Sequence, residues 1–183
     1  DTYLPSEMAP SIVNYTIGCD QIAKRMPTYA HGIADTITPS AFAGLSDMIT
    51  GVDFPNCESV GSYAFNNCTL VSEVSLPSCR TIGEGAFISC KAISTLSLPV
   101  CEVISNKAFI SCTSLTNISA PNLTVLGTNT DIGYNGPFES CTRLTSAYVP
   151  NLANILDRAF CNCFSLSDLS ISKCTLLGAY ALT

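Results

Sequence analysis

The sequence contains little charge, since only 12% of its 183 residues are Asp, Glu, Lys or Arg. The balance is acidic, with a formal net charge of −6, and no cluster of lysine and arginine is present. Nucleic acids and anionic membrane surfaces both attract such basic clusters. The composition therefore argues against a nucleic-acid-binding protein and against one that binds acidic lipid surfaces.

Long apolar runs and reactive groups are scarce as well. No hydrophobic run approaches the roughly 20 residues of a membrane-spanning helix, so we expect no membrane insertion. Histidine occurs once, at His31, and tryptophan not at all. A Cys–His nucleophile pair would need His31, and no Gly-rich phosphate loop is present. We interpret His31 as a surface or packing residue and expect no enzyme activity and no cofactor.

The sequence contains instead a strong internal repeat. The run from Leu76 to Cys90 returns as Leu98 to Cys112, and three residue types recur in register. Successive members are 22 residues apart, except for one step of 29 in each series. A period of roughly 20–29 residues with apolar anchors predicts a leucine-rich-repeat solenoid. The anchors are Pro55, Pro77, Pro99, Pro121 and Pro150; Phe65, Phe87, Phe109, Phe138 and Phe160; and Cys68, Cys90, Cys112, Cys141 and Cys163.

Each repeat changes from a strand pattern to a turn pattern. Leu70, Val74 and Leu76 predict a short strand with one face inward, and proline ends it because proline cannot donate to a ladder. The rest of the repeat is too short for a helix and its turns. We expect a tight turn at Gly61 and Gly83, then a turn or 3₁₀ segment that points Ala and Phe inward. Stacked coils would give one parallel sheet with strands about 4.8 Å apart, opposite a column of phenylalanines.

Nine of the eleven cysteines occupy two positions of the repeat, where other repeats carry leucine. A cysteine that alternates with leucine behaves as a small buried hydrophobe. Neighbouring thiols one strand spacing apart are also poorly placed for a disulfide. We therefore predict buried, reduced thiols at these positions, and we expect Cys161, beside Cys163, to point outward. The nine are Cys57, Cys79, Cys101 and Cys174, and the five that follow phenylalanine.

Two segments have a weak likeness to metal sites. The Cys161-Asn162-Cys163 spacer is too short for tetrahedral zinc. The insertion over 128–136 has oxygen-bearing residues at alternate positions but lacks the acidic residues of a calcium loop. We expect no metal and an ordinary turn-rich loop. Its Tyr134 is a candidate contact residue, because loops on a rigid scaffold often carry binding residues.

The combined run Leu-Pro-x-x-Leu/Cys-x-x-Ile-Gly-x-x-Ala-Phe-x-x-Cys-x-x-Leu resembles the BspA-like (treponemal-type) family of leucine-rich repeats. The resemblance covers residues 34–183. It implies a right-handed solenoid found on bacterial and some protist cell surfaces, with adhesion and partner binding as the usual roles, and it implies no catalytic residue. The chain departs from the family pattern in the insertion after Gly127 and in its cysteines, which stand where leucine is usual.

The domain organisation follows from where the repeat begins. We predict an N-terminal cap over 1–33, with a short helix or an irregular strand-and-turn between Ser11 and Met26. The solenoid would cover 34–183, with one half unit, about five full units and one incomplete final unit. Any secretory leader or surface anchor is expected to lie outside this chain. Because the last strand, at Leu169 and Ile171, would have an open edge, we expect either continuation beyond Thr183 or self-association through the C-terminal coil.

Candidate partner-binding residues lie on the outward side of the predicted strands, in two small, polar rows without an aromatic stripe for sugars. We predict a non-catalytic, secreted or cell-surface module of bacterial type that binds or adheres to a protein or glycan. The alternative is a structural spacer within a longer surface protein, with a merely solvated face. The candidates are Asp53, Glu73, Thr95, Asn117, Tyr148 and Asp168, together with Tyr134.

Overall fold

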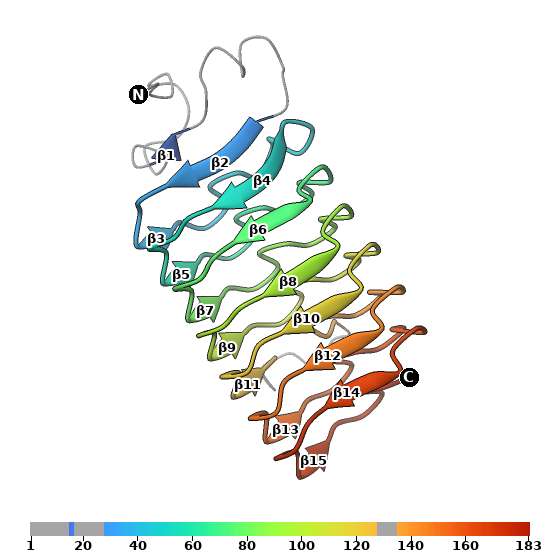
Figure 1. The fold of residues 1–183 in the computed structure, drawn as a ribbon. Helices are drawn as coiled ribbons and strands as arrows, with labels where there is room; N and C mark the ends of the chain where they lie inside the picture. Colours follow the sequence, from blue (N-terminus) through green and yellow to red (C-terminus); the bar gives the residue numbers. More distant parts are fainter. Residues whose placement is uncertain (1–14, 17–27, 128–134) are drawn as a thin grey trace.

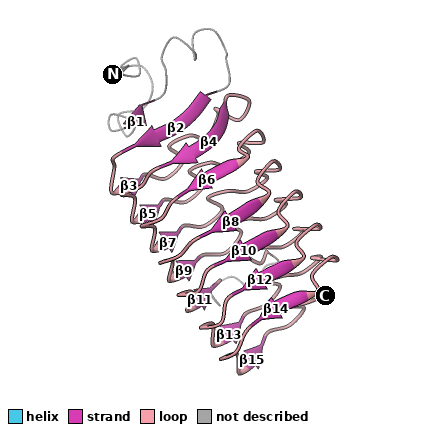
Figure 2. Ribbon diagram, viewed as in Figure 1, coloured by secondary structure: helices cyan, strands magenta, loops and turns pink. Residues whose placement is uncertain are grey.

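The computed structural model of the protein describes residues 15–16, 28–127 and 135–183. In this part of the chain the secondary structure consists of strands and turns without a helix (Figure 2). The chain winds into a solenoid of about six coils, each about 22 residues long (Figure 1). The leucine-rich-repeat solenoid predicted from the sequence is therefore confirmed.

The longer strands form a parallel ladder along one side of the solenoid (Figure 1). Residues 22 apart face each other, as in Gly51 opposite Glu73, and the 29-residue step keeps Asn117 opposite Ser146. Pairing is continuous from β2 through β6 and from β8 through β14, and β6 packs beside β8. The strands are β2 (Thr28–Gly32), β4 (Ile49–Asp53), β6 (Glu73–Ser75), β8 (Thr95–Ser97), β10 (Asn117–Ser119), β12 (Ser146–Tyr148) and β14 (Asp168–Ser170).

A second parallel ladder of two-residue strands runs along another side, where the sequence predicted only turns and 3₁₀ segments. It pairs without interruption from β3 to β11 and again from β13 to β15. Two residues are too few for a periodic signal in one sequence, and stacking on the neighbouring coil makes them a strand. The strands are β3 (Thr36–Ile37), β5 (Ser59–Val60), β7 (Thr81–Ile82), β9 (Val103–Ile104), β11 (Val125–Leu126), β13 (Asn154–Ile155) and β15 (Leu176–Leu177).

The N-terminal part begins the first ladder one coil earlier than the sequence suggested. Strand β1 (Tyr15–Thr16) pairs antiparallel with β2, and β2 pairs parallel with β4. Ala30 of β2 is fully buried in the core, in line with Val52. β1 occupies the free edge of β2, where an unpaired strand would otherwise offer a template for association. The helix considered between Ser11 and Met26 lies outside the described residues, apart from Tyr15 and Thr16.

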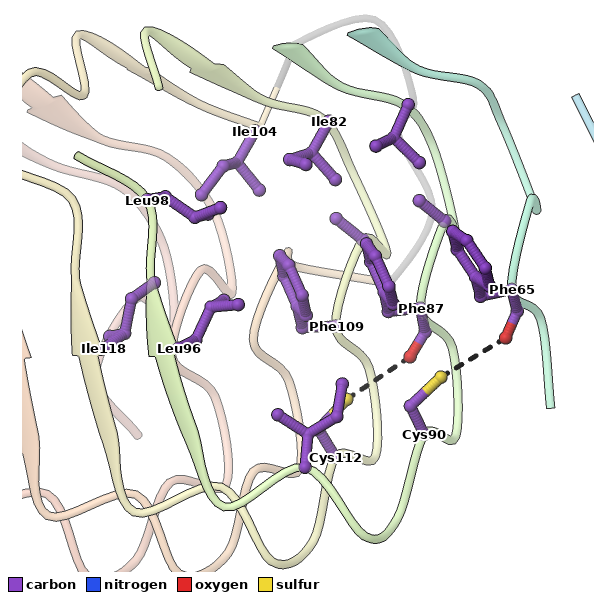
Figure 3. Packing of buried hydrophobic residues seen from close by; sticks show 14 of the residues in the cluster. Phe65, Ile82, Phe87, Cys90, Leu96, Leu98, Ile104, Phe109, Cys112 and Ile118 are labelled. Carbon is purple, nitrogen blue, oxygen red and sulfur yellow. Dashed lines mark hydrogen bonds between the residues drawn. The ribbon is translucent and has the colours of Figure 1, made fainter. Parts of the chain in front are cut away.

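The phenylalanines form one stacked column, as predicted. Six rings, from Phe42 to Phe160, lie nearly parallel with neighbouring centroids 4.8–5.4 Å apart, and every ring is at most 1% exposed. Phe65, Phe87 and Phe109 show this stacking beside the aliphatic residues Ile82 and Ile104 (Figure 3). Parallel, closely spaced aromatic rings add contact energy beyond their burial. The column therefore links every coil to its neighbours.

The cysteines beside this column are buried free thiols, as predicted. Each donates a hydrogen bond to the phenylalanine carbonyl of the preceding coil: Cys90 to Phe65 at 3.2 Å and Cys112 to Phe87 at 3.3 Å (Figure 3). The same carbonyl accepts the backbone N–H of its own coil, as in Cys90 N–H to Phe87. A carbonyl oxygen has two lone pairs, and the thiol uses the second. Leucine at this position could not do so.

In the turn that carries phenylalanine, some backbone N–H groups donate to the next coil and others donate within the same turn. Phe87 N–H donates to Ala108 of the next coil at 2.8 Å, whereas Cys90 N–H closes its own turn. Residues two before and two after Phe65, Phe87, Phe109 and Phe160 have φ near +60°, as in Tyr63 at 57° and Asn67 at 60°. This left-handed conformation favours Gly and Asn and strains most other residues. Tyr63 is held in it by two backbone bonds, because its N–H donates to Glu84 of the next coil at 2.8 Å and its carbonyl accepts from Asn66 of its own turn.

Three side chains differ from their predicted positions. Cys174 was expected to be buried like the other eight repeat cysteines but is half-buried, because it lies in the last coil. Leu70 was expected inward but is 41% exposed, and Val71 is fully buried instead. The strand begins only at Glu73, so strand alternation does not extend back to Leu70. Cys161 was expected outward but is only 6% exposed, because Thr183 Oγ1 lies 3.6 Å and Arg158 Nη1 3.9 Å from its sulfur. Cys161 directly follows Phe160 in the turn, and its side chain contacts Thr183 of the next coil.

Candidate binding surface

The outward side chains of the long strands form two parallel rows, which we call together the strand face. Its Glu73 row and its Asp53 row are fixed by backbone pairing, with Tyr29 opposite Gly51 and His31 opposite Asp53 at the first step. The Glu73 row consists of Tyr29, Gly51, Glu73, Thr95, Asn117, Ser146 and Asp168; the Asp53 row consists of His31, Asp53, Ser75, Ser97, Ser119, Tyr148 and Ser170.

Six of the seven candidate binding residues from the sequence lie on this face. Four of them, Glu73 included, belong to the Glu73 row. Asp53 and Tyr148 lie in the neighbouring row, and all six are exposed. The seventh, Tyr134, lies outside the described residues. The structure therefore brings these six side chains onto one surface. The residues are Asp53, Glu73, Thr95, Asn117, Tyr148 and Asp168.

At the N-terminal end of the strand face, a tyrosine crosses a glycine to reach a carboxylate. The phenol of Tyr29 donates a hydrogen bond to Glu73, two strands away. Its ring lies over Gly51, where a Cβ atom would come within 2.2 Å of the ring carbon Cε1. The hydrogen bond to Glu73 raises the pKa of Tyr29, with smaller contributions from burial and from the charges of Glu73 and Asp53. Glycine at position 51 is therefore what permits this contact.

At the C-terminal end the face carries a second exposed tyrosine and a third carboxylate. Tyr148 on β12 is 47% exposed. Ser146 Oγ donates to Asp168 Oδ2 at 3.2 Å, across neighbouring strands. Between the two ends, Thr95, Ser97 and Ser119 leave a floor of small hydroxyl side chains. The face is thus polar, with small side chains in the middle and an aromatic side chain and a carboxylate at both ends.

Ion pairs lie on the other sides of the solenoid. Arg80 pairs with Glu102 at 2.7 Å, Lys107 with Glu84 at 2.8 Å and Arg158 with Glu139 at 3.6 Å. Lys107 holds the pKa of Glu84 below its usual value, helped by a hydrogen bond from Tyr63. These pairs join neighbouring coils along the turns and the short-strand ladder. They are partly exposed, so each contributes little to stability.

The described residues contain no group of three or more His, Cys, Asp and Glu side chains that could hold a metal ion. Among the same residues, no helix has the length and hydrophobicity required to cross a membrane. His31 is exposed on the strand face, and its neighbour in the ladder is Asp53. The cysteine thiols around the phenylalanine column are buried. The geometry offers exposed hydrogen-bonding groups and carboxylates for contact with a partner.

Tyr29 and His31 were missed as members of the face because both fall in the segment interpreted as a cap. The signal was nevertheless present in the sequence. Ala30 lies 22 residues before Val52 and 44 before Val74, which is the spacing of the inward residue of each long strand. The segment lacks the proline and phenylalanine anchors of the later repeats. In this segment, the 22-residue period is therefore visible only at Ala30.

Likeness to one solved structure supports the solenoid, and two others match with lower TM-scores. The chain is similar to a leucine-rich repeat protein of T. pallidum, with a TM-score of 0.68 and 19% identity over 97% of this chain and 86% of that one. A leucine-rich repeat protein of Bacteroides ovatus matches at 19% identity and TM-score 0.38, over 82% of this chain and 56% of its own. A leucine-rich cell surface protein of Faecalibacterium prausnitzii matches at 16% identity and TM-score 0.34, over 90% and 70%. No curated protein sequence matches the chain.

The family is shown by the sequence itself. The pattern of the BspA type leucine rich repeat region, which contains six copies, matches residues 35–133 and 123–183. These ranges contain every phenylalanine of the stacked column and every long strand from β4 onward. The resemblance stated from the repeat motif is therefore confirmed, and this chain belongs to the BspA-type leucine-rich repeat family.

Proposed function

We propose that the protein is a non-catalytic binding or adhesion module that works outside the cell or at its surface and contacts a protein or glycan partner through the strand face. The observation that supports this most is the arrangement of exposed side chains in two registered rows over seven strands. Leucine-rich-repeat solenoids are typically protein-binding or scaffold modules. Extended surfaces of stacked repeats suit such binding.

The strand face suits a partner better than the short-strand ladder does. Its outward positions carry hydroxyl, amide and carboxylate groups, and Tyr29 and Tyr148 are 41% and 47% exposed. Tyrosine is enriched at interfaces because it offers a large contact area and one polar group. The outward positions of the short strands carry no carboxylate and no aromatic residue: three are apolar and four are polar but uncharged, namely Val103, Val125 and Leu176, and Thr36, Ser59, Thr81 and Asn154.

The experiment is a binding array of proteins and glycans probed with the purified chain and with two surface variants. Ser75→Arg with Ser97→Arg places two bulky side chains on exposed positions of the strand face. Val125→Arg with Asn154→Arg does the same on exposed positions of the short-strand ladder, with the same change in charge. We expect the first variant to lose binding and the second to keep it. Loss in both, or loss only in the second, would contradict the strand face as the contact surface.

The competing hypothesis, a structural spacer, makes a different prediction for the same array. A spacer would show no reproducible partner with the unaltered chain, and neither variant would change anything. That result would overturn the binding proposal directly. Thermal unfolding of all three proteins serves as the folding control, because substitutions at exposed positions usually change stability little.

A further inference from the structure

The strand face holds carboxylates without any lysine or arginine, although both occur elsewhere on the solenoid. Asp53, Glu73 and Asp168 are the acidic residues of the two rows, and His31 is the one histidine there. None of the three forms an ion pair with lysine or arginine in the part of the chain that the structure describes. The six described lysine and arginine residues all lie outside both rows: Arg80, Lys91, Lys107, Arg143, Arg158 and Lys173.

The contrast with the other sides of the solenoid is the second observation. There, acidic and basic residues are mixed: Glu84, Glu102 and Glu139 each pair with a basic residue of the same chain, and four further acidic residues are exposed without an ion pair among the described residues, namely Asp35, Asp47, Glu58 and Asp157. The six described lysine and arginine residues thus share the other sides of the solenoid with seven acidic residues, whereas the strand face has three carboxylates and neither lysine nor arginine. An interface with such a face gains affinity and association rate from a partner of opposite charge.

From this charge distribution we propose that the partner presents an extended segment carrying lysine or arginine, which lies across the long strands. This inference rests on the proposed function, because it names the chemistry of the partner at the same face. The carboxylates of Asp53 and Glu73 would receive basic side chains at one end, and Asp168 would receive one at the other. The Ser and Thr hydroxyls between them would donate to and accept from the segment's backbone.

The spacing of the carboxylates sets the length of the segment. Glu73 lies on β6 and Asp168 on β14, four strands further along the ladder. At about 4.8 Å for each step, the two ends are about 19 Å apart. An extended chain advances about 3.3 Å per residue, so basic residues about six positions apart would reach both ends. Tyr29 and Tyr148, at the two ends of the face, would pack against the stems of the basic side chains.

The experiment measures binding of synthetic peptides by fluorescence anisotropy. The probe is a labelled peptide of about ten serine and threonine residues, with two lysines at its start and one lysine about six residues further on. One control peptide has the same composition with its three lysines adjacent, and another has glutamine in place of lysine. Titrations at about 50 mM and about 300 mM salt separate charge-driven binding from other contacts.

Two protein variants remove the same number of charges. Asp53→Asn, Glu73→Gln and Asp168→Asn neutralise the strand face, whereas Asp35→Asn, Asp47→Asn and Glu58→Gln neutralise three exposed acidic residues away from it. We expect the first variant to weaken binding of the spaced peptide at least about tenfold and the second to change it less than about twofold. The adjacent-lysine peptide should bind more weakly than the spaced one, and the glutamine peptide should not bind.

Four outcomes would overturn the inference. Equal losses in both variants would mean that net charge alone attracts the peptide. Equal binding of both lysine peptides would remove the spacing argument. A partner found on the array that is a glycan or an acidic protein, and whose binding Ser75→Arg with Ser97→Arg removes, would leave the proposed function standing while refuting a cationic partner. If the array stays empty and the spaced peptide does not bind, both proposals fail together.

Discussion

The central coils and the last coil have the same repeat but different surroundings. Leu96, Ile104 and Phe109 in the centre are at most 3% exposed. At the equivalent positions of the last coil, Leu169 is half-buried, while Leu177 and Leu182 are 53% and 47% exposed. A central coil is covered on both sides, whereas the last coil has a neighbour on one side only. The burial of each residue is therefore set by stacking of coils, as expected for a solenoid whose stability is a sum of neighbour contacts.

The buried thiols of the inner coils should make the protein sensitive to alkaline pH, and this is the largest effect we expect. Burial raises the pKa of Cys68 and of Cys101 to about 12, from an ordinary value of 9.0. Burial also raises the pKa of Cys90 and of Cys112 well above that value. Because the folded state holds these protons more tightly than the unfolded state, their contribution to stability is complete below pH 9 and is lost as pH rises further.

The expected loss is about 1.4 kcal/mol per thiol for each pH unit above 9, so four thiols would cost about 6 kcal/mol by pH 10. Urea unfolding from pH 7 to pH 10.5, followed by circular dichroism, measures it. Cys68→Ala should reduce the steepness of the fall by the share of one thiol. A flat profile up to pH 10.5 would show that these thiols are not held protonated by the fold.

The phenylalanine column gives the next largest difference between centre and end. Phe87 and Phe109 are fully buried, with ring centroids 5.2 Å apart and a further ring stacked on the outer side of each. Phe109→Ala should leave a cavity that costs about 3–5 kcal/mol in the free energy of unfolding. Leu182→Ala, at the same repeat position in the last coil, should cost about 1 kcal/mol or less because its side chain is half exposed.

The measurement is the urea midpoint and the slope of the unfolding curve for each variant. Both variants shorten a side chain to alanine at the same position of the repeat, so their losses of stability can be compared directly. Similar, sub-kilocalorie losses at Phe109 and Leu182 would contradict coupling between coils. A large loss at Leu182 alone would mean that the last coil, and not the centre, limits stability.

The sequence predicted the parts of the fold that recur at fixed spacing. Phe87 and Cys90 each have counterparts 22 residues away on both sides, so the repeat alone was enough to predict that they stack and are buried. The outward position of Glu73 and Asp53 followed from the same spacing. Both candidate rows could therefore be predicted, apart from the residues contributed by β2.

What could not be predicted depends on contacts that a single period does not encode. Leu70 and Val71 are adjacent apolar residues, and only the late start of β6 decides which one is buried. Cys161 is covered by Arg158 of its own turn and by Thr183 of the next coil. Tyr29 reaches Glu73 because position 51 is glycine, a relation across three strands. These are tertiary contacts, so sequence periodicity does not reveal them.

Alkylation kinetics should separate the two regions residue by residue. Cys112 is fully buried and donates to Phe87, whereas Cys174 in the last coil is half-buried and donates to Leu176 at 3.3 Å. With iodoacetamide at pH 8 and no reductant, Cys174 should be modified in the native protein well before Cys112, which should react only after denaturation. Peptide mapping by mass spectrometry identifies the modified sites. Disulfide-linked peptides in place of modified ones would contradict the free thiols, and equal rates would contradict the difference in burial.

The smallest effect we expect is weak self-association through the last coil. Leu166, Leu169 and Ile171 are only partly buried, beside the unpaired edge of β14. Such an edge with apolar neighbours favours contact with another strand, and two copies joined by a two-fold axis would cover both ends at once. Sedimentation equilibrium should therefore give an average mass that rises above 19.3 kDa with concentration. Ile171→Lys should abolish the rise, because a charged side chain would have to be buried in the contact. Ser97→Lys, which adds the same charge to an exposed position of a central strand, should leave it unchanged. A mass of 19.3 kDa at every concentration would refute the association, and an equal effect of both variants would attribute it to net charge instead of the last coil.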